Sequence, residues 1–237
     1  MINLHNAESL VTIICLLCAY LFSVTLTGTG QALVAHKMGD DTAADQGLLS
    51  LNPLEHLDAI GLMLIVLLGF GWGRQIPIDP HNIHNPHRGF KLFLVYCTEA
   101  LLSILIAIIS LIILVFAFGT YPLAFALQMF FSGNVPMKTF TTVFPEASSL
   151  AIVGALILLA FVFFNVFIAS LSLILNGFRY AMVIGHDRGY NYMRYADYLT
   201  FLAPLLVLFF FADPLRSLLM HLIMYSAYGI AYILGAC

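Results

Sequence analysis

The chain has 237 residues, of which 62% are hydrophobic and 9% are charged, with a formal net charge of −3 at pH 7. A soluble domain carries about a quarter charged residues, so this much apolar surface cannot be hidden in one water-soluble core. The small negative charge gives no reason to expect nucleic acid as a partner. The composition therefore excludes an ordinary soluble domain and predicts a membrane protein in contact with the lipid bilayer.

Apolar runs recur along the chain, at 9–36, 91–118, 147–175, 196–212 and 215–235. At about 1.5 Å per residue, each crosses or nearly crosses a hydrocarbon layer of ~30 Å. A sixth run, at 59–70, is shorter and suits a re-entrant or half-membrane segment. No Lys or Arg precedes the first run, so a removable signal peptide is not expected.

The connections between these runs are polar. Residues 39–57 are acidic and include a β-like stretch from Gly47 to Leu51, and residues 71–90 are rich in proline and histidine. Residues 177–195 form a basic, tyrosine-rich connection. We therefore expect one all-α polytopic membrane domain over 1–237. It is a bundle of about five full transmembrane helices, with one short re-entrant or half-membrane segment and a small β-like cytosolic stretch.

The distribution of basic residues predicts the orientation. If the short run is re-entrant, seven of the nine Lys and Arg residues lie on one side of the membrane. The positive-inside rule places that side in the cytoplasm. The N-terminus is then outside and the C-terminus is cytoplasmic.

Three sequence blocks carry motifs in a characteristic order. Residues 27–40 read TGTGQALVAHKMGD, residues 51–61 read LNPLEHLDAIG, and residues 70–80 read FGWGRQIPIDP. The first resembles the His-Glu-x-x-His helix, with its VAYRLGD-like tail, of the site-2 protease family of intramembrane zinc metalloproteases. The other two resemble the LNPxxHxDPxG and FGWAKPVPVNP blocks of a short bacterial branch, which implies a location in the plasma (bacterial inner) membrane.

In that family, two histidines one helical turn apart bind zinc, and the glutamate between them activates the bound water. The resemblance aligns Thr27 with the first histidine, Gly28 with the glutamate and Gln31 with the second histidine. Asn176 aligns with the aspartate that supplies the third ligand. Threonine and amide oxygens are weak, neutral ligands, and glycine offers no base. The resemblance therefore implies a pseudoprotease with no catalytic residues and no zinc.

The expected function is that of a non-catalytic scaffold or accessory subunit, which binds a partner's transmembrane segment in the inherited groove. The predicted groove residues are Thr27, Gly28, Gly30, Gln31, Glu99 and Asn176. Small residues on the first helix allow close helix approach in lipid. Besides the bilayer, the expected partner is another membrane-protein subunit or a second copy of the chain.

Glu99 is an acidic residue within a predicted membrane helix. A carboxylate at this depth is costly and normally faces a partner or a cavity. We expect it to hydrogen-bond Thr27, Thr29 or Gln31 across a helix interface, in part of the space where zinc would sit. A proton-relay or substrate-binding role is the alternative.

His81, His84 and His87 lie at three-residue spacing and are weak metal-site candidates. Pro86 and the asparagines between them prevent a regular helix that would aim all three inward. No metal is therefore expected at this loop. Contact with lipid headgroups is the alternative that the resemblance implies.

Two other functions remain open. One is an active protease with rearranged ligands from His36, His56, Asp58 or the histidine loop. His36, however, lies about 140° around the helix from Gln31 and does not replace it on the same face. The other is a proton or small-solute pathway around Glu99, although the sequence carries no inverted repeat of the transporter type.

Overall fold

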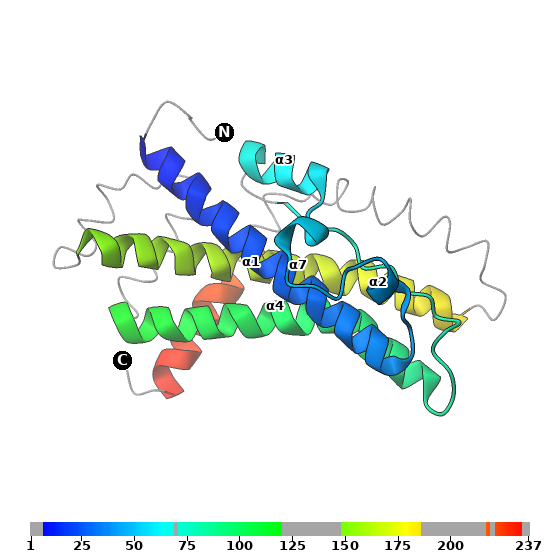
Figure 1. Ribbon diagram of the computed structural model, residues 1–237. Helices are drawn as coiled ribbons and strands as arrows, with labels where there is room; N and C mark the ends of the chain where they lie inside the picture. The colour runs from blue at the N-terminus through cyan, green and yellow to red at the C-terminus, as the bar shows by residue number, and fades with distance from the viewer. Residues whose placement is uncertain (1–6, 69–70, 120–147, 186–216, 219–220, 234–237) are drawn as a thin grey trace.

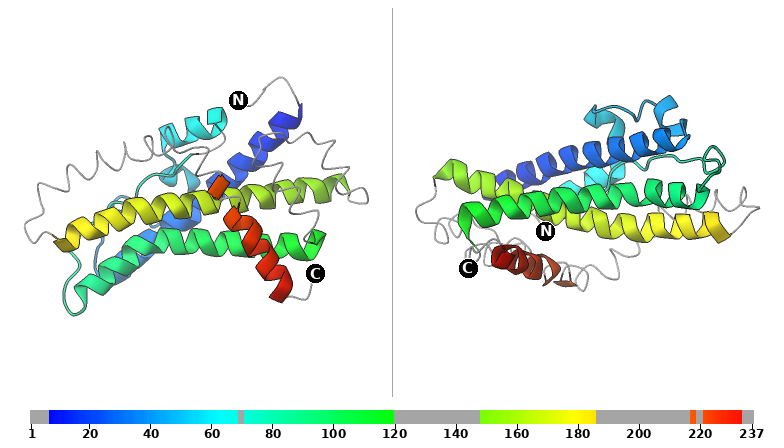
Figure 2. Two further views of the ribbon diagram at one scale, coloured as in Figure 1. Left: turned by 180° about the vertical axis from the view of Figure 1, so that it is seen from behind. Right: turned by 90° about the horizontal axis from the view of Figure 1, so that it is seen from below.

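The computed structural model describes residues 7–68, 71–119, 148–185, 217–218 and 221–233. Within these ranges the regular structure is helical, with no strand. The long helices are α1 (Ala7–Met38), α4 (Arg88–Phe118) and α7 (Ser149–Gly185). Helices α4 and α7 run side by side and α1 crosses both (Figure 1). The helical residues 221–233 lie on the opposite side of α4 and α7 from α1 (Figure 2).

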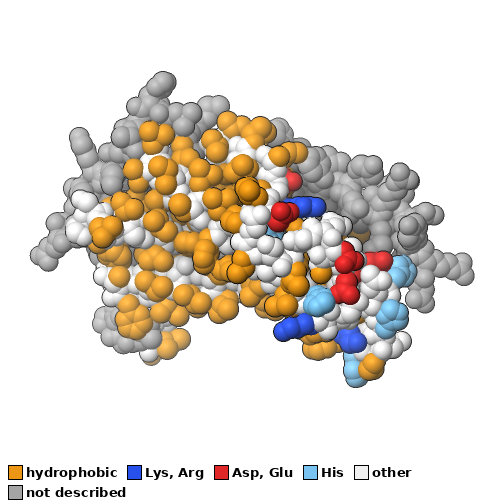
Figure 3. All heavy atoms as spheres, viewed as in Figure 1, with side chains coloured by type: hydrophobic (Ala, Val, Ile, Leu, Met, Phe, Trp, Pro, Cys, Tyr) orange, Lys and Arg blue, Asp and Glu red, His pale blue; other side chains and the backbone are white. Residues whose placement is uncertain are grey.

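Within the described residues, three helices are long and apolar enough to cross a membrane: Ile13–Met38 within α1, Arg88–Phe118, and Ser149–Gly185. Apolar side chains cover most of one broad face, whereas charged and histidine side chains gather at one end (Figure 3). On α4, exposed Leu101, Leu105 and Ile109 lie at helical spacing and suit contact with lipid tails. The chain is therefore a membrane protein. The predicted run at 196–212 lies outside the described residues.

A short helix, α3 (Ala59–Leu68), corresponds to the short predicted run. Its 10 residues extend for about 15 Å, which is half of a hydrocarbon layer. The carboxylate of Asp58 caps its first turn by accepting a hydrogen bond from Gly61 N at 2.7 Å. The membrane depth predicted for this segment stays a prediction.

The β-like stretch predicted from Gly47 to Leu51 is wrong, because the backbone turns there. Gly47 has a φ of +76°, and Leu48 N donates to Ala43 O at 3.0 Å just after the short helix α2 (Thr42–Asp45). Leu48 is fully buried in a small cluster that includes Ala43. The backbone therefore forms a turn around a buried leucine where a β-like stretch was predicted.

Helix α7 continues past the predicted boundary at 175, through Gly177, to Gly185. The basic residues that follow were predicted to form a connection. This stretch contains no proline, so one glycine does not end the helix. As a result, Ser172, Asn176 and Arg179 lie four and three residues apart on one helix face.

The buried core joins the three long helices. Tyr20 and Phe164 are fully buried, and their rings meet edge to face with centroids 5.5 Å apart. Asn165 Nδ2 donates to Ser23 Oγ at 2.8 Å, so a polar bond also links α7 to α1. Tyr20 Oη donates to Trp72 O at 3.1 Å and thereby fixes the segment after α3 against α1.

Asp40 is a buried carboxylate that ties two connections together at the polar end. Its oxygens accept hydrogen bonds from Thr42 N at 3.2 Å, Thr42 Oγ1 at 2.5 Å, Asp79 N at 2.8 Å and Asn82 Nδ2 at 3.0 Å. Its side chain is fully buried. Hydrogen bonds to a charged acceptor are among the stronger ones in proteins.

Replacing Asp40 by alanine is expected to destabilise the protein by about 2 kcal/mol, because several buried donors lose their acceptor together. The thermal unfolding midpoint, measured in mild detergent, reports this loss of stability. The matched control is Asp45→Ala, since the Asp45 side chain is exposed on α2. An equal shift in both variants would show that the buried carboxylate contributes no more than a surface charge.

Candidate functional site

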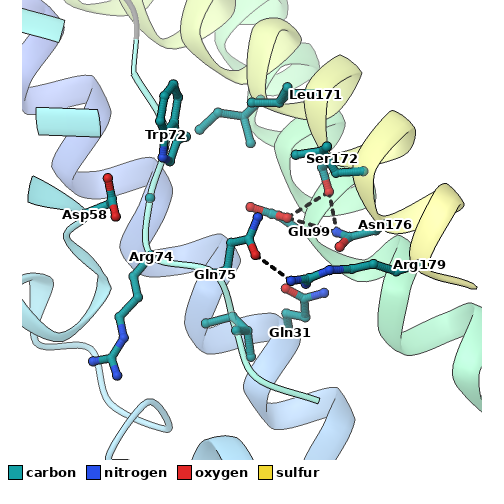
Figure 4. A pocket seen from close by; sticks show the side chains of 14 residues that line it. Gln31, Asp58, Trp72, Arg74, Gln75, Glu99, Leu171, Ser172, Asn176 and Arg179 are labelled. Atoms are coloured by element: carbon teal, nitrogen blue, oxygen red, sulfur yellow. Dashed lines mark hydrogen bonds between the residues drawn. The ribbon is translucent and has the colours of Figure 1, made fainter. Parts of the chain in front are cut away.

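A cavity of about 310 Å³ lies among α1, α4, α7 and the segment after α3. Its helical walls carry the polar side chains of Gln31, Glu99, Ser172, Asn176 and Arg179. Figure 4 shows these side chains converging from three different helices. The structure therefore brings together three of the six predicted groove residues: Gln31, Glu99 and Asn176.

Glu99 lies at the centre of a polar cluster. Its Oε2 accepts hydrogen bonds from Ser172 Oγ at 2.8 Å and from Asn176 Nδ2 at 3.1 Å, and Asn176 Nδ2 also lies 2.8 Å from Ser172 Oγ. These partners are on α7. The prediction that Glu99 bonds to Thr27, Thr29 or Gln31 is wrong, because its side chain points between α4 and α7.

At two of the positions that align with the family's zinc ligands, the side chain donates a hydrogen bond to a backbone carbonyl. Gln31 is 3% exposed, and its Nε2 donates to Val95 O on α4 at 3.1 Å. Thr27 is buried, and its Oγ1 donates to Ser23 O within its own helix at 2.9 Å. Gln31 lines the cavity, whereas Thr27 faces its own helix backbone and does not line it.

The two predicted groove glycines are close-packing positions outside the cavity. A Cβ placed on Gly28 would lie 2.5 Å from Nδ1 of His56, so the imidazole fills the space next to the position of the family's base. A Cβ placed on Gly30 would lie 2.2 Å from a methyl group of Leu102, so this glycine allows α1 to approach α4.

His56 is fully buried and its ring is held at one end. Nε2 lies 2.8 Å from Ser50 O and 3.0 Å from Thr29 Oγ1. The Thr29 hydroxyl also donates to Ser50 O, at 2.6 Å. Thr29, Ser50 and His56 therefore form one cluster, in which a hydrogen on His56 Nε2 has Ser50 O and Thr29 Oγ1 as acceptors. Nδ1 has no hydrogen-bond partner among the described residues and lies against Gly28.

The side chains at the degenerate positions do not fit a zinc ion. A protein zinc site needs imidazole, thiolate or carboxylate ligands, and the cavity lining offers only the carboxylates of Glu99 and Asp58. Within the residues that the structure describes, no group of three or more His, Cys, Asp or Glu side chains is placed to hold a metal ion. No hydrolytic step through zinc is therefore derived from this geometry.

The histidines of residues 81–87 and the other candidate zinc ligands do not meet at a common site in the described part of the chain. His81, His84 and His87 are exposed, and His84 Nδ1 bonds to Asn82 O at 2.6 Å. His36 pairs with Asp41 at the polar end of α1. These side chains form no metal-binding group in the described part of the chain.

The second wall of the cavity was not predicted. It consists of Asp58 and of Trp72 to Ile76 in the segment after α3. Arg179 donates from its guanidinium to Gln75 Oε1 and so links this wall to α7. The spacing of Ser172, Asn176 and Arg179 can be read from the sequence. It indicates a shared helix face only once α7 is known to continue past Gly177.

The comparison with known proteins gives one informative match. A relative in Bacillus subtilis (strain 168), named "Putative zinc metalloprotease YwhC", is 38% identical over 113 residues, which cover 46% of this chain and 52% of the relative. The match agrees with the motifs and supports the predicted family. Over the matched residues, the chain is similar to this relative.

The chain spans about half the length of the curated relative it matches. No family model matches the chain, and no solved structure matches it. Gln31 and Asn176, which the resemblance aligns with two zinc ligands of the family, both line the cavity. The name of the relative refers to zinc chemistry, which the side chains at these positions do not support in this chain.

Proposed function

We propose that this site-2-protease-like protein is a non-catalytic membrane scaffold or accessory subunit that binds a transmembrane segment of a partner. The observation that carries the proposal is the bonding of the former ligand positions. Gln31 bonds to a backbone carbonyl of α4, and Asn176 bonds to Glu99, while a cavity stays open beside them. Polar side chains at membrane depth that face a cavity are typical of a binding site.

The proposal includes the location. The basic residues favour a plasma (bacterial inner) membrane protein with the polar end of Figure 3 in the cytoplasm. Arg88 and Lys91 lie at the start of α4, at the same end as the Asp40 cluster. The helix end that carries them would then lie at the cytoplasmic headgroup region, with the cavity accessible from that side.

The absence of metal chemistry has a direct test. Protein purified in mild detergent with zinc in all buffers, then desalted, is expected to contain less than about 0.1 zinc per chain by elemental analysis. It is also expected to leave a fluorescent transmembrane peptide uncut. Stoichiometric zinc that is lost in Glu99→Gln or His56→Ala would contradict the non-catalytic proposal and favour rearranged ligands.

Binding of a partner is tested by filling the cavity. Ser172 is 4% exposed and lines the cavity, so Ser172→Phe is expected to displace a stoichiometric membrane partner during affinity purification. The matched control is Leu173→Phe, because Leu173 is 51% exposed on the outer face of the same helix. A pure single species from the unaltered chain, or equal recovery of the partner with both variants, would count against the scaffold.

A further inference from the structure

Residues 221–233 form a helix whose inner face joins the core of the bundle. Ile223, Ala227 and Ala231 recur at intervals of four residues, and all three are buried in the cluster that also holds apolar side chains of α4 and α7. Figure 2 shows this helix crossing α4 and α7 at a steep angle and between their ends. Its axis therefore runs across the membrane-spanning helices rather than along them.

The outer face of this helix carries three exposed tyrosines. Tyr225, Tyr228 and Tyr232 are 74%, 47% and 82% exposed, and helical spacing places them within an arc of about 60°. Gly229 is exposed beside them, and a Cβ placed on it would meet nothing within 4 Å. The outer face thus combines three phenol groups with one open position on the backbone.

Lipid tails do not suit this outer face. A phenol hydroxyl in hydrocarbon loses its hydrogen bonds to water, which costs free energy unless another polar group replaces them. Tyrosine is enriched at the two membrane–water interfaces for this reason. Here the helix crosses α4 and α7 between their ends, so an interfacial position does not account for the tyrosines (Figure 2). A protein surface that hydrogen-bonds to them does.

The order of residues on the outer face matches a second copy of the same face. Two copies in one membrane are related by a two-fold axis along the membrane normal, so a helix that runs across the normal meets its copy antiparallel. When the pair is centred between positions 228 and 229, Tyr228 of one copy opposes Gly229 of the other, and Tyr225 opposes Tyr232. A ring then meets the open space over a glycine, and each phenol meets a phenol that both donates and accepts.

Charge does not oppose this pairing. Residues 221–233 contain no Lys, Arg, Asp or Glu, so two copies of the face do not repel each other. We propose that the outer face of residues 221–233 is the interface of a two-fold homodimer, in which the two helices pack antiparallel around Tyr228 and Gly229. The proposal goes beyond the scaffold function and uses no residue that lines the cavity, so the two fail independently.

Energy transfer between donor-labelled and acceptor-labelled full chains in liposomes measures the pairing over a range of protein densities. We expect the transfer to rise to the plateau of a dimer. Gly229→Leu fills the open position and is expected to raise the half-maximal density at least about tenfold. The matched control is Gly177→Leu, because Gly177 is also exposed and an added Cβ meets nothing within 4 Å. The control should leave the half-maximal density unchanged.

The hydroxyl groups are tested by replacing Tyr225 and Tyr232 together by phenylalanine. This double variant keeps both rings, and we expect it to weaken the pairing about threefold. Thermal unfolding in detergent shows whether each variant is folded, and the double variant keeps the test valid if Gly229→Leu does not fold.

Cysteine cross-linking with an added oxidant tests the antiparallel arrangement, in a chain whose native cysteines are replaced by alanine. Tyr228→Cys is expected to cross-link to its own copy, because position 228 opposes position 229. Tyr225→Cys is not, because position 225 opposes position 232, which lies about 10 Å further along the helix. Equal cross-linking of the two variants would overturn the antiparallel interface.

Three further outcomes would overturn the homodimer. The first is a chain that stays monomeric in liposomes at every density, and the second is an equal loss of pairing in Gly229→Leu and Gly177→Leu. The third is a different membrane protein that copurifies with the unaltered chain and is displaced by Gly229→Leu, which would assign the outer face to that protein. Ser172→Phe, which alters only the cavity, is expected to leave the pairing intact.

Discussion

Replacing Gly61 by alanine is expected to destabilise the protein by more than about 3 kcal/mol. A Cβ there would lie 1.9 Å from Trp72 O and 2.9 Å from Trp72 N. In return, a Cβ on Gly71 would lie 2.1 Å from Gly61 O, so two backbones are in direct contact. Backbone atoms cannot rotate away as a side chain does, and overpacking of this kind exceeds the usual cost of an added methyl group.

The measurement is the unfolding midpoint in detergent, combined with recovery of the membrane partner by affinity purification. Because Trp72 lines the cavity, its displacement in Gly61→Ala is expected to weaken binding as well. The matched control is Gly154→Ala in α7, where a Cβ meets nothing within 4 Å. In a helix, alanine is more favourable than glycine by about 0.5–1 kcal/mol. We therefore expect Gly154→Ala to stabilise the protein and Gly61→Ala to destabilise it.

Replacing Gly28 by alanine is expected to destabilise the protein by about 2–3 kcal/mol, because the added Cβ displaces the His56 ring. That ring is fully buried and its Nε2 is fixed by Ser50 and Thr29, so it has little freedom to move. His56→Ala should also be destabilising, through the cavity it leaves. The double variant is expected to be no less stable than His56→Ala alone, since the clash is gone.

A double-mutant cycle of unfolding free energies tests this coupling. Additive effects of the two substitutions would show that Gly28 and His56 do not compete for the same space. Gly177→Ala is a suitable control, because a Cβ there meets nothing within 4 Å. The result also bears on the position that the resemblance aligns with the family's glutamate, because Gly28→Glu would place a carboxylate there only if the imidazole first moved away.

The long helices could be predicted because an apolar run long enough to cross a bilayer has few other solutions. The predicted 9–36 and 91–118 agree with α1 and α4 to within about three residues, and 59–70 agrees with α3 at its start. The continuation of α7 was missed because a glycine followed by basic residues also describes a helix end.

The site was predicted in part. Motif spacing brought Gln31 and Asn176 together correctly, because the resemblance fixed where two helices had to meet. The partners of Glu99 could not be predicted, since the choice between α1 and α7 depends on helix rotation, which hydrophobicity alone does not set. The packing of His56 against Gly28 depends on a loop folding back on α1, and no local pattern encodes that contact.

The Asp40 cluster also has a consequence for the order in which the chain is made and inserted. Asp40 and Asp79, whose backbone nitrogen it binds, are separated by 39 residues, so the carboxylate emerges from the ribosome before that donor emerges. Until then only water and Thr42 can satisfy it, which keeps the end of α1 at the aqueous boundary while α3 is synthesised. We therefore expect Asp40 to limit the depth of the first helix during insertion, before its hydrogen bonds join the two connections in the folded protein.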